Sequence, residues 1–216
     1  TEEHVIWLVH TSYMPLCKTL QEMIRLSKGR FHCALSVSGV MLEMLQQYAP
    51  EMIDVLKDLA DSGCVEFVAT PYSQSLATVY SDTEAAEQLQ SQQAIVKQLF
   101  NQQSTTICNT ELIYSDEIAI SLYQQGYKTV MTEGAKHVLS WKSPNYVYSS
   151  ASAPKMKMLL RNSYLSDELA FHFADPDWHN YPMDAERYIE QLAALPEEEQ
   201  VVNIWVGAET FGIRQH

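Results

Sequence analysis

The sequence has few of the residues on which several classes of protein depend. Its 216 residues include only four cysteines, Cys17, Cys33, Cys64 and Cys108, and these are far apart and form no CxxC pair. Zinc sites and disulfide frameworks use closely or regularly spaced cysteines, so neither is indicated. We expect buried, reduced thiols, which suit the cytoplasm, and we predict that location.

Basic residues are scarce as well. Lys and Arg number 14 against 27 Asp and Glu, which gives a net charge of −13. This balance disfavours nucleic acid and anionic membrane as partners, because both reward Lys and Arg. A neutral substrate such as a sugar is compatible with it, and so is a plain solvated acidic surface.

Long apolar runs, signal peptides and low-complexity linkers are absent too. The chain starts at Thr1 inside a helix-like stretch, so we expect residues, and any targeting signal, to precede it. Hydrophobic residues make up 46% of the chain, which is typical of a globular protein. We therefore predict a single domain over residues 1–216.

Strand-like and helix-like patterns alternate along the chain. The predicted strands are Phe31–Val37, Val65–Ala69, Thr105–Asn109, Thr129–Thr132, Lys157–Arg161 and Val201–Val206. The predicted helices are Leu16–Ser27, Val40–Tyr48, Pro50–Ala60, Ser81–Phe100, Ser115–Gln125 and Asp184–Leu195. Repeated strand–helix units indicate a parallel sheet, either open and doubly wound or closed into a barrel. No Gly-rich phosphate loop follows a strand, which favours the barrel, and the opening helix lacks a strand before it, so we expect seven or eight strands in all.

In such barrels the chemistry lies at the carboxyl ends of the strands. The residues found there are Ser36, Ser38, Tyr72, Gln74, Glu111, Glu133, Asn162 and Glu209. Three of them are acids, so the pattern predicts that carboxylates converge on one rim.

The segment "CNTELIYSD" has two interpretations. In one, Ser115 and Asp116 cap the next helix and Glu111 is an ordinary surface charge. In the other, Asn109 and Tyr114 hold Glu111 by hydrogen bonds, and Glu111 acts as a nucleophile or general base. Position alone leaves both open for Glu111.

Two further segments could contact a ligand. In "TEGAKHVLSWKSPNYVY" the rings of Trp141, Tyr146 and Tyr148 could stack on sugars and His137 could contact a ligand, or the segment could be a packed surface loop. In "NSYLSDELAFHF" we expect Asp167 and Glu168 in the first turn of a helix.

The simpler explanation for Glu168 is pairing with the helix dipole, and we favour it. His172 would then be an ordinary helix residue. His4, His10 and His216 show no metal-like spacing with acids, so we predict no metal.

Taken together, the segments resemble glycoside hydrolase family 57, and its α-amylase branch in particular. The resembling stretches are "SVSGVMLEMLQQYAPEMIDVLKDLADSGCVEFVA", "NTELIYSDEIA", "TEGAKHVLSWKSPNYVY", "LLRNSYLSDELAFHF" and "ETFG". The resemblance implies an incomplete parallel (β/α)7-type barrel, a retaining mechanism, α-glucan or maltooligosaccharide as the substrate, and no cofactor. It also implies a first strand, containing a His, upstream of Thr1.

Carried over by position, Glu111 matches the family nucleophile, whereas the position of the family's acid is Gly207. Glu209 is a possible substitute, but two residues of extended strand would displace it by roughly 6.5 Å. The substrate-binding residues that we predict are Tyr72, Gln74, His137, Trp141, Tyr146 and Asp167. Gln74 itself departs from the family's usual His.

We therefore expect an α-amylase-like domain with very low hydrolysis, or a non-catalytic α-glucan-binding homologue. A deacetylase-like barrel is a third option, but it would need metal ligands at the strand ends, which the sequence does not offer.

Overall fold

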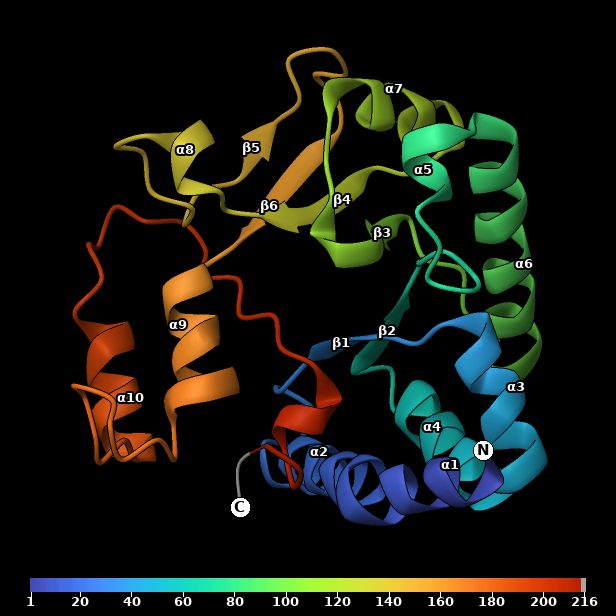
Figure 1. The fold of residues 1–216 in the computed structure, drawn as a ribbon, viewed down its shortest axis with the longest axis horizontal. Coiled ribbons are helices and arrows are strands. Elements are labelled where there is room, and N and C mark those ends of the chain that lie inside the picture. Colours follow the sequence, from blue (N-terminus) through green and yellow to red (C-terminus); the bar gives the residue numbers. More distant parts are fainter. Residues whose placement is uncertain (215–216) are drawn as a thin grey trace.

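A computed structural model describes residues 1–214 as an arc of short strands with helices around it (Figure 1). His216 lies outside the described residues. The strands are β1 (Cys33–Ser36), β2 (Val65–Val68), β3 (Thr106–Cys108), β4 (Thr129–Glu133), β5 (Tyr148–Ser149) and β6 (Lys157–Arg161). They form one sheet of order β1-β2 and another of order β3-β4-β6-β5.

One backbone bridge joins the two sheets. The N–H of Ala69 donates to the carbonyl of Thr106 at 2.9 Å, and the N–H of Cys108 donates to the carbonyl of Ala69 at 2.8 Å. The order across the arc is therefore β1-β2-β3-β4-β6, all parallel, with β5 antiparallel to β6. This confirms the predicted parallel sheet, but the described strands are short and close no barrel.

The sixth predicted strand, Val201–Val206, is wrong. The segment makes one isolated bridge, between Asn203 and Arg161. Side chains take the backbone groups that a ladder would use: the N–H of Trp205 donates to Ser166 Oγ at 3.1 Å, and Arg161 Nε donates to the Trp205 carbonyl at 2.9 Å. The chain therefore runs past the end of β6 as an extended segment that meets this strand at one bridge and forms no ladder with it.

A nearly continuous helix opens the chain. It comprises α1 (Glu2–Leu8), the π-helical turn η1 (Val9–Tyr13) and α2 (Met14–Leu26). Pro15 explains the wider turn, because proline has no N–H to donate and its ring crowds the carbonyl four residues back.

The remaining helices surround the strands. They are α3 (Gly39–Tyr48), α4 (Pro50–Asp61), α5 (Ala77–Tyr80), α6 (Asp82–Phe100), α7 (Asp116–Gln124), α8 (Lys136–Leu139), α9 (Ser163–Asp167) and α10 (Ala185–Ala193), with the short turns η2 (Thr110–Leu112), η3 (Glu168–His172) and η4 (Ala208–Thr210). The predicted cap at Ser115 is confirmed, since its side chain accepts a backbone N–H of α7, and Ser81 caps α6 in the same way. Among the described residues, no helix is both long and apolar enough to cross a membrane.

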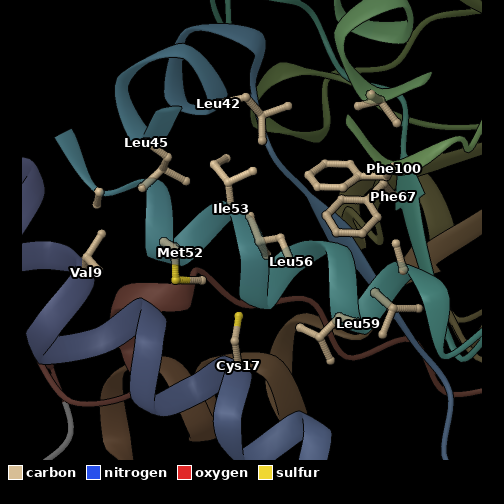
Figure 2. Packing of buried hydrophobic residues seen from close by; sticks show 14 of the residues in the cluster. Val9, Cys17, Leu42, Leu45, Met52, Ile53, Leu56, Leu59, Phe67 and Phe100 are labelled. Carbon is tan, nitrogen blue, oxygen red and sulfur yellow. The ribbon is translucent and has the colours of Figure 1, made fainter. Parts of the chain in front are cut away.

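The largest core lies between β1, β2 and the helices α2, α3, α4 and α6 (Figure 2). Phe67 of β2 stacks on Phe100 of α6, with ring centroids 4.1 Å apart. Helix α4 turns Met52, Ile53 and Leu56 toward this centre, a spacing that puts them on one helix face. The core therefore packs the helices against β1 and β2, and loops follow the carboxyl ends of these strands.

Candidate active site

The turn after β3 carries Glu111 and is strained. Glu111 has φ 52° and ψ 23°, and Leu112 has φ 53°. The left-handed region costs a residue with a side chain roughly 1–2 kcal/mol relative to the right-handed one. Two such residues in succession are typical of functional sites, where the surrounding structure enforces the conformation.

Neighbouring side chains hold this turn in place. Asn109 Oδ1 accepts the N–H of Thr110 at 3.0 Å, and the hydroxyl of Thr132 donates to the carbonyl of Leu112 at 3.0 Å. Thr110 and Leu112 are buried on either side of Glu111. Because both neighbours point inward, the Glu111 side chain is directed out, and it is exposed.

The hydrogen bonds predicted for Glu111 are not made. Tyr114 donates instead to Asp116 at 2.8 Å, and Asn109 serves the backbone of the turn. Within residues 1–214 the Glu111 carboxylate has no hydrogen-bond partner, so it is free to meet a ligand.

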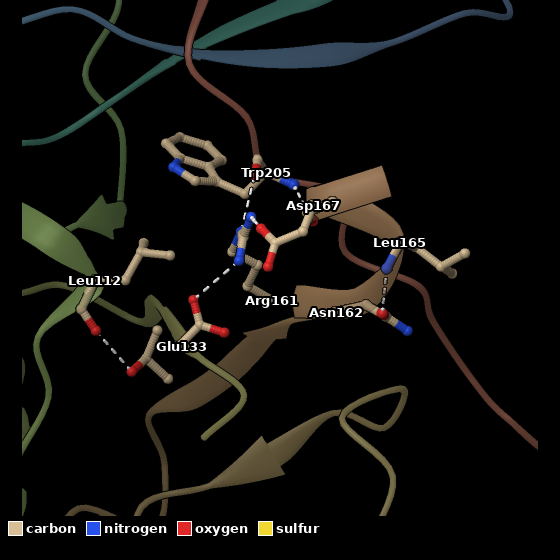
Figure 3. A network of polar contacts seen from close by, with 9 residues as sticks. Leu112, Glu133, Arg161, Asn162, Leu165, Asp167 and Trp205 are labelled. Atoms are coloured by element: carbon tan, nitrogen blue, oxygen red, sulfur yellow. Dashed lines mark hydrogen bonds and ion pairs between the residues drawn. The ribbon is translucent and has the colours of Figure 1, made fainter. Parts of the chain in front are cut away.

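Arg161, at the end of β6, organises the adjoining rim (Figure 3). Its Nη2 lies 2.6 Å from Asp167 Oδ1, its Nη1 lies 3.3 Å from Glu133 Oε2, and its Nε donates to the Trp205 carbonyl. One guanidinium thus ties β4, α9 and the 201–206 segment together. The sequence analysis did not single out Arg161, although an arginine at the end of a strand, among strand-end acids, could have indicated these ion pairs. Asp167, predicted to bind substrate, is already ion-paired.

The 201–206 segment reaches the same rim as Glu111. The Trp205 side chain packs against the cluster of Val68, Cys108 and Leu112 at the ends of β2 and β3. Burial raises the pKa of the Cys108 thiol to about 12. Cys108 therefore contributes apolar packing beneath Trp205 rather than a nucleophile.

Gly207 and Glu209 do not lie on the extended strand that the sequence suggested. Gly207 precedes the 3-10 turn η4, and the Glu209 side chain folds back toward it. A Cβ added to Gly207 would lie 3.0 Å from Glu209 Oε2. The expected separation of roughly 6.5 Å was based on strand geometry. That assumption does not hold here, because residues 208–210 form a 3-10 turn.

Tyr72 and Gln74 belong to the loop after β2. The Tyr72 ring lies over Gly39, where a Cβ would come within 2.1 Å of it, and Glu43 raises the Tyr72 pKa to about 12 by hydrogen bonding. Tyr72 thus lines an open groove of about 520 Å³ with residues of α3 and α6. Gln74 is exposed in a turn closed by its N–H and the carbonyl of Pro71. Their contacts with substrate remain predictions.

The aromatic segment after β4 forms α8, a loop and β5. His137 is exposed on α8, Trp141 is 88% exposed, and Tyr146 is half-buried. The Tyr148 hydroxyl donates to the carbonyl of Ser143 at 2.6 Å, which closes the loop. The loop is therefore tied back on itself while Trp141 projects, and its role in binding stays a prediction.

Glu168 is not a surface partner of a helix dipole, and that interpretation was wrong. Its side chain is fully buried, and Oε1 accepts the Trp178 indole N–H at 2.7 Å. It is the first residue of the π-helical turn η3, which continues directly from α9. His172 is more than an ordinary helix residue, because it stacks on Trp178 with ring centroids 3.7 Å apart. This cluster supports the helical layer beside the rim.

Among residues 1–214, no group of three His, Cys, Asp or Glu side chains is arranged to hold a metal ion. The strand ends instead present carboxylates, one exposed at Glu111 and two paired with Arg161, whereas Glu209 lies in η4 and accepts the Tyr13 hydroxyl. Most glycosidases use a pair of carboxyl groups that flank the scissile glycosidic bond.

Comparison with known families decides the class. The model of "Glycosyl hydrolase family 57" matches residues 3–216. The chain belongs to glycosyl hydrolase family 57. This family 57 chain is similar to a protein of Methanocaldococcus jannaschii named "Putative alpha-amylase", with 36% identity over 201 residues. That match covers 93% of this chain and 42% of the relative, so the chain spans less than half of the relative's length.

Solved structures share the fold of this family 57 chain. The 4-alpha-glucanotransferase of Thermococcus litoralis matches with a TM-score of 0.77 at 18% identity, over 99% of this chain and 31% of that one. A protein of Mycobacterium smegmatis described as a "putative polysaccharide deacetylase" matches with a TM-score of 0.64 at 14% identity, over 94% of this chain and 68% of that one. The fold alone is therefore shared with the deacetylase class, and the family match separates the two.

Proposed function

We propose that this chain is part of an α-glucan-directed, α-amylase-like retaining glycosidase in which Glu111 is the nucleophile. The observation that carries the proposal is the strained, exposed carboxylate at the carboxyl end of β3. Family membership and the name of the M. jannaschii relative support the substrate class.

The proposal includes a (β/α)7-type barrel of which the observed arc is a part. The parallel order β1-β2-β3-β4-β6 supports it, as does the likeness to the glucanotransferase fold. Substrate would lie across the strand ends, with Trp141 as a stacking platform at the edge of the site. We propose a cytoplasmic location on the basis of the four free thiols.

A second candidate is a non-catalytic α-glucan-binding homologue. The observation that favours it is Gly207, which has no side chain at the position where the family resemblance places the acid. A retaining glycosidase needs a second carboxyl group roughly 5–5.5 Å from the nucleophile.

Covalent trapping tests Glu111 directly. The complete protein is incubated with a fluorinated α-glucosyl fluoride, whose glycosyl–enzyme ester hydrolyses slowly, and the intact mass is measured. We expect one added sugar on a peptide that contains Glu111, and none on Glu111→Gln. Calorimetry with maltooligosaccharide runs in parallel: binding without an adduct or turnover would favour the non-catalytic homologue, and no binding would reject both.

A further inference from the structure

The side chain of Asn109 spans the turn that carries Glu111. Its Oδ1 accepts the N–H of Thr110 at 3.0 Å, and its Nδ2 donates to the carbonyl of Ile113 at 2.9 Å. The two left-handed residues, Glu111 and Leu112, lie between these bonds. Asn109 is 2% exposed, so water has little access to its amide. One carboxamide therefore joins both ends of the strained turn.

Two threonine hydroxyls brace the same turn from neighbouring elements. Thr78 of α5 donates to Asn109 Oδ1 at 3.1 Å, so this oxygen accepts two hydrogen bonds and both of its lone pairs are used. Thr132 of β4, which is 4% exposed, donates to the carbonyl of Leu112 at 3.0 Å. The turn is thus held by its own asparagine and by two elements that are distant from it in the sequence.

The Glu111 carboxylate depends on these bonds, because it is exposed and accepts no hydrogen bond of its own within residues 1–214. Such a side chain is oriented only by its backbone and its rotamer. The left-handed backbone at Glu111 sets the direction of the side chain, and the bonds of Asn109 and Thr132 keep that backbone in place. A nucleophile must meet the reacting carbon at a defined distance and angle, so this support bears on its reactivity.

We propose that Asn109 and Thr132 are the positioning residues of Glu111, and that they act through the peptide groups of the turn without touching the substrate. The inference rests on the proposed function, with Glu111 as the nucleophile. Loosening the turn should slow the attack of the carboxylate on the anomeric carbon and leave the affinity for the sugar nearly unchanged. A misplacement of about 1 Å is enough to slow such a step by about 10²-fold.

Trapping with the fluorinated α-glucosyl fluoride isolates this step in the complete protein. A Glu111 oxygen bonds to the anomeric carbon, the C–F bond breaks, and fluoride leaves with the bonding electrons, so no proton donor is needed. The dependence of the trapping rate on reagent concentration separates the limiting rate from the half-saturating concentration. We expect Asn109→Ala to lower the limiting rate by about 10- to 10²-fold and to leave the half-saturating concentration nearly unchanged.

A pair of substitutions at Thr132 makes the same test with less risk to folding. Thr132→Val removes the hydroxyl but keeps the shape of the side chain, so it should also lower the limiting rate. Thr132→Ser keeps the hydroxyl and should retain most of the wild-type rate. The matched control is Tyr188→Phe, which removes a hydroxyl-to-carbonyl bond of 3.0 Å between α10 and Leu165 and should leave the limiting rate unchanged.

The outcomes separate this inference from the proposed function. Trapping at the wild-type rate in Thr132→Val, or in a folded Asn109→Ala, overturns the positioning role and leaves Glu111 as the nucleophile. So does a higher half-saturating concentration at an unchanged limiting rate, because the side chain would then contact the sugar. A Thr132→Ser variant as slow as Thr132→Val, or an equally slow Tyr188→Phe, also overturns it, since the lost hydroxyl at the turn would not be the cause. A wild type that forms no adduct on Glu111 rejects the proposed function itself, and this inference with it.

Discussion

Arg161 joins three parts of the rim through one guanidinium, and a lysine in its place tests whether that geometry matters. Lysine keeps the charge but offers a single ammonium group. It can retain one of the two ion pairs, and it cannot also reach the Trp205 carbonyl that Arg161 Nε now binds at 2.9 Å. We therefore expect Arg161→Lys to destabilise the protein.

The magnitude follows from exposure. The Glu133 and Asp167 side chains are 38% and 40% exposed, so each ion pair is close to a surface pair and stabilises by about 0.2–1 kcal/mol. The bond from the guanidinium to the carbonyl is shielded, since the Arg161 side chain is 13% exposed, and a charged hydrogen bond contributes about 1.5–3 kcal/mol. Losing this bond and one pair should cost roughly 2–4 kcal/mol.

Urea unfolding followed by circular dichroism measures this cost, with Arg25→Lys as the matched control. Arg25 pairs with Glu22 on an exposed face of α2, so its replacement should leave the free energy of unfolding nearly unchanged. Raising NaCl to 1 M screens the ion pairs but not the carbonyl bond, so most of the Arg161→Lys deficit should persist. A deficit below about 0.5 kcal/mol, or one that vanishes in salt, would refute the reasoning.

Three other outcomes are expected. Trp178→Phe should lower the free energy of unfolding by about 1.5–3 kcal/mol, because it removes the main donor to the buried Glu168 carboxylate, and the loss should shrink in a Glu168→Gln background if the charge is what matters. Trp141→Ala should weaken maltooligosaccharide binding in calorimetry without moving the unfolding midpoint, since the ring is 88% exposed; equal affinities would remove the loop from the site. Burial raises the pKa of Cys17 and of Cys108 from 9.0 to about 12, so both thiols ionise in the unfolded chain before they ionise in the fold. The contribution of each protonated thiol to the free energy of unfolding is complete below pH 9 and is lost as the pH rises toward 12, by up to about 1.4 kcal/mol per pH unit. A Cys108→Ala variant whose free energy of unfolding falls with pH as steeply as that of the wild type would contradict this.

The strands and helices that form from local patterns were predictable. β1 to β4 and β6 appear where apolar runs are bounded by turn residues, and α6 and α7 begin at the serines that cap them. The segment Val201–Val206 has the same apolar pattern, yet it is not a strand. Its backbone groups bind Ser166 and Arg161 side chains, and a local pattern carries no information about such distant partners.

The site was predictable to a similar extent. The rule that chemistry lies at strand ends singled out Glu111, which does follow β3, because the rule depends only on element order. The position of Glu209 over Gly207 depends on one 3-10 turn, and a two-residue change in backbone geometry is invisible in composition. Glu168 looked like a first-turn acid because charge near a helix start usually is one, and only packing reveals its burial.

Because of the left-handed backbone at Glu111, selection for stability opposes selection for a carboxylate at this position. Glycine adopts this conformation without steric penalty, so Glu111→Gly would relieve roughly 1–2 kcal/mol of strain at an exposed position with no contact to lose. Leu112 is equally strained but buried, and deleting its side chain would cost more than the relief, about 2–5 kcal/mol. A library screened for heat or protease resistance should therefore converge on glycine at 111 and keep leucine at 112. The most durable clones would be those that had discarded the carboxylate.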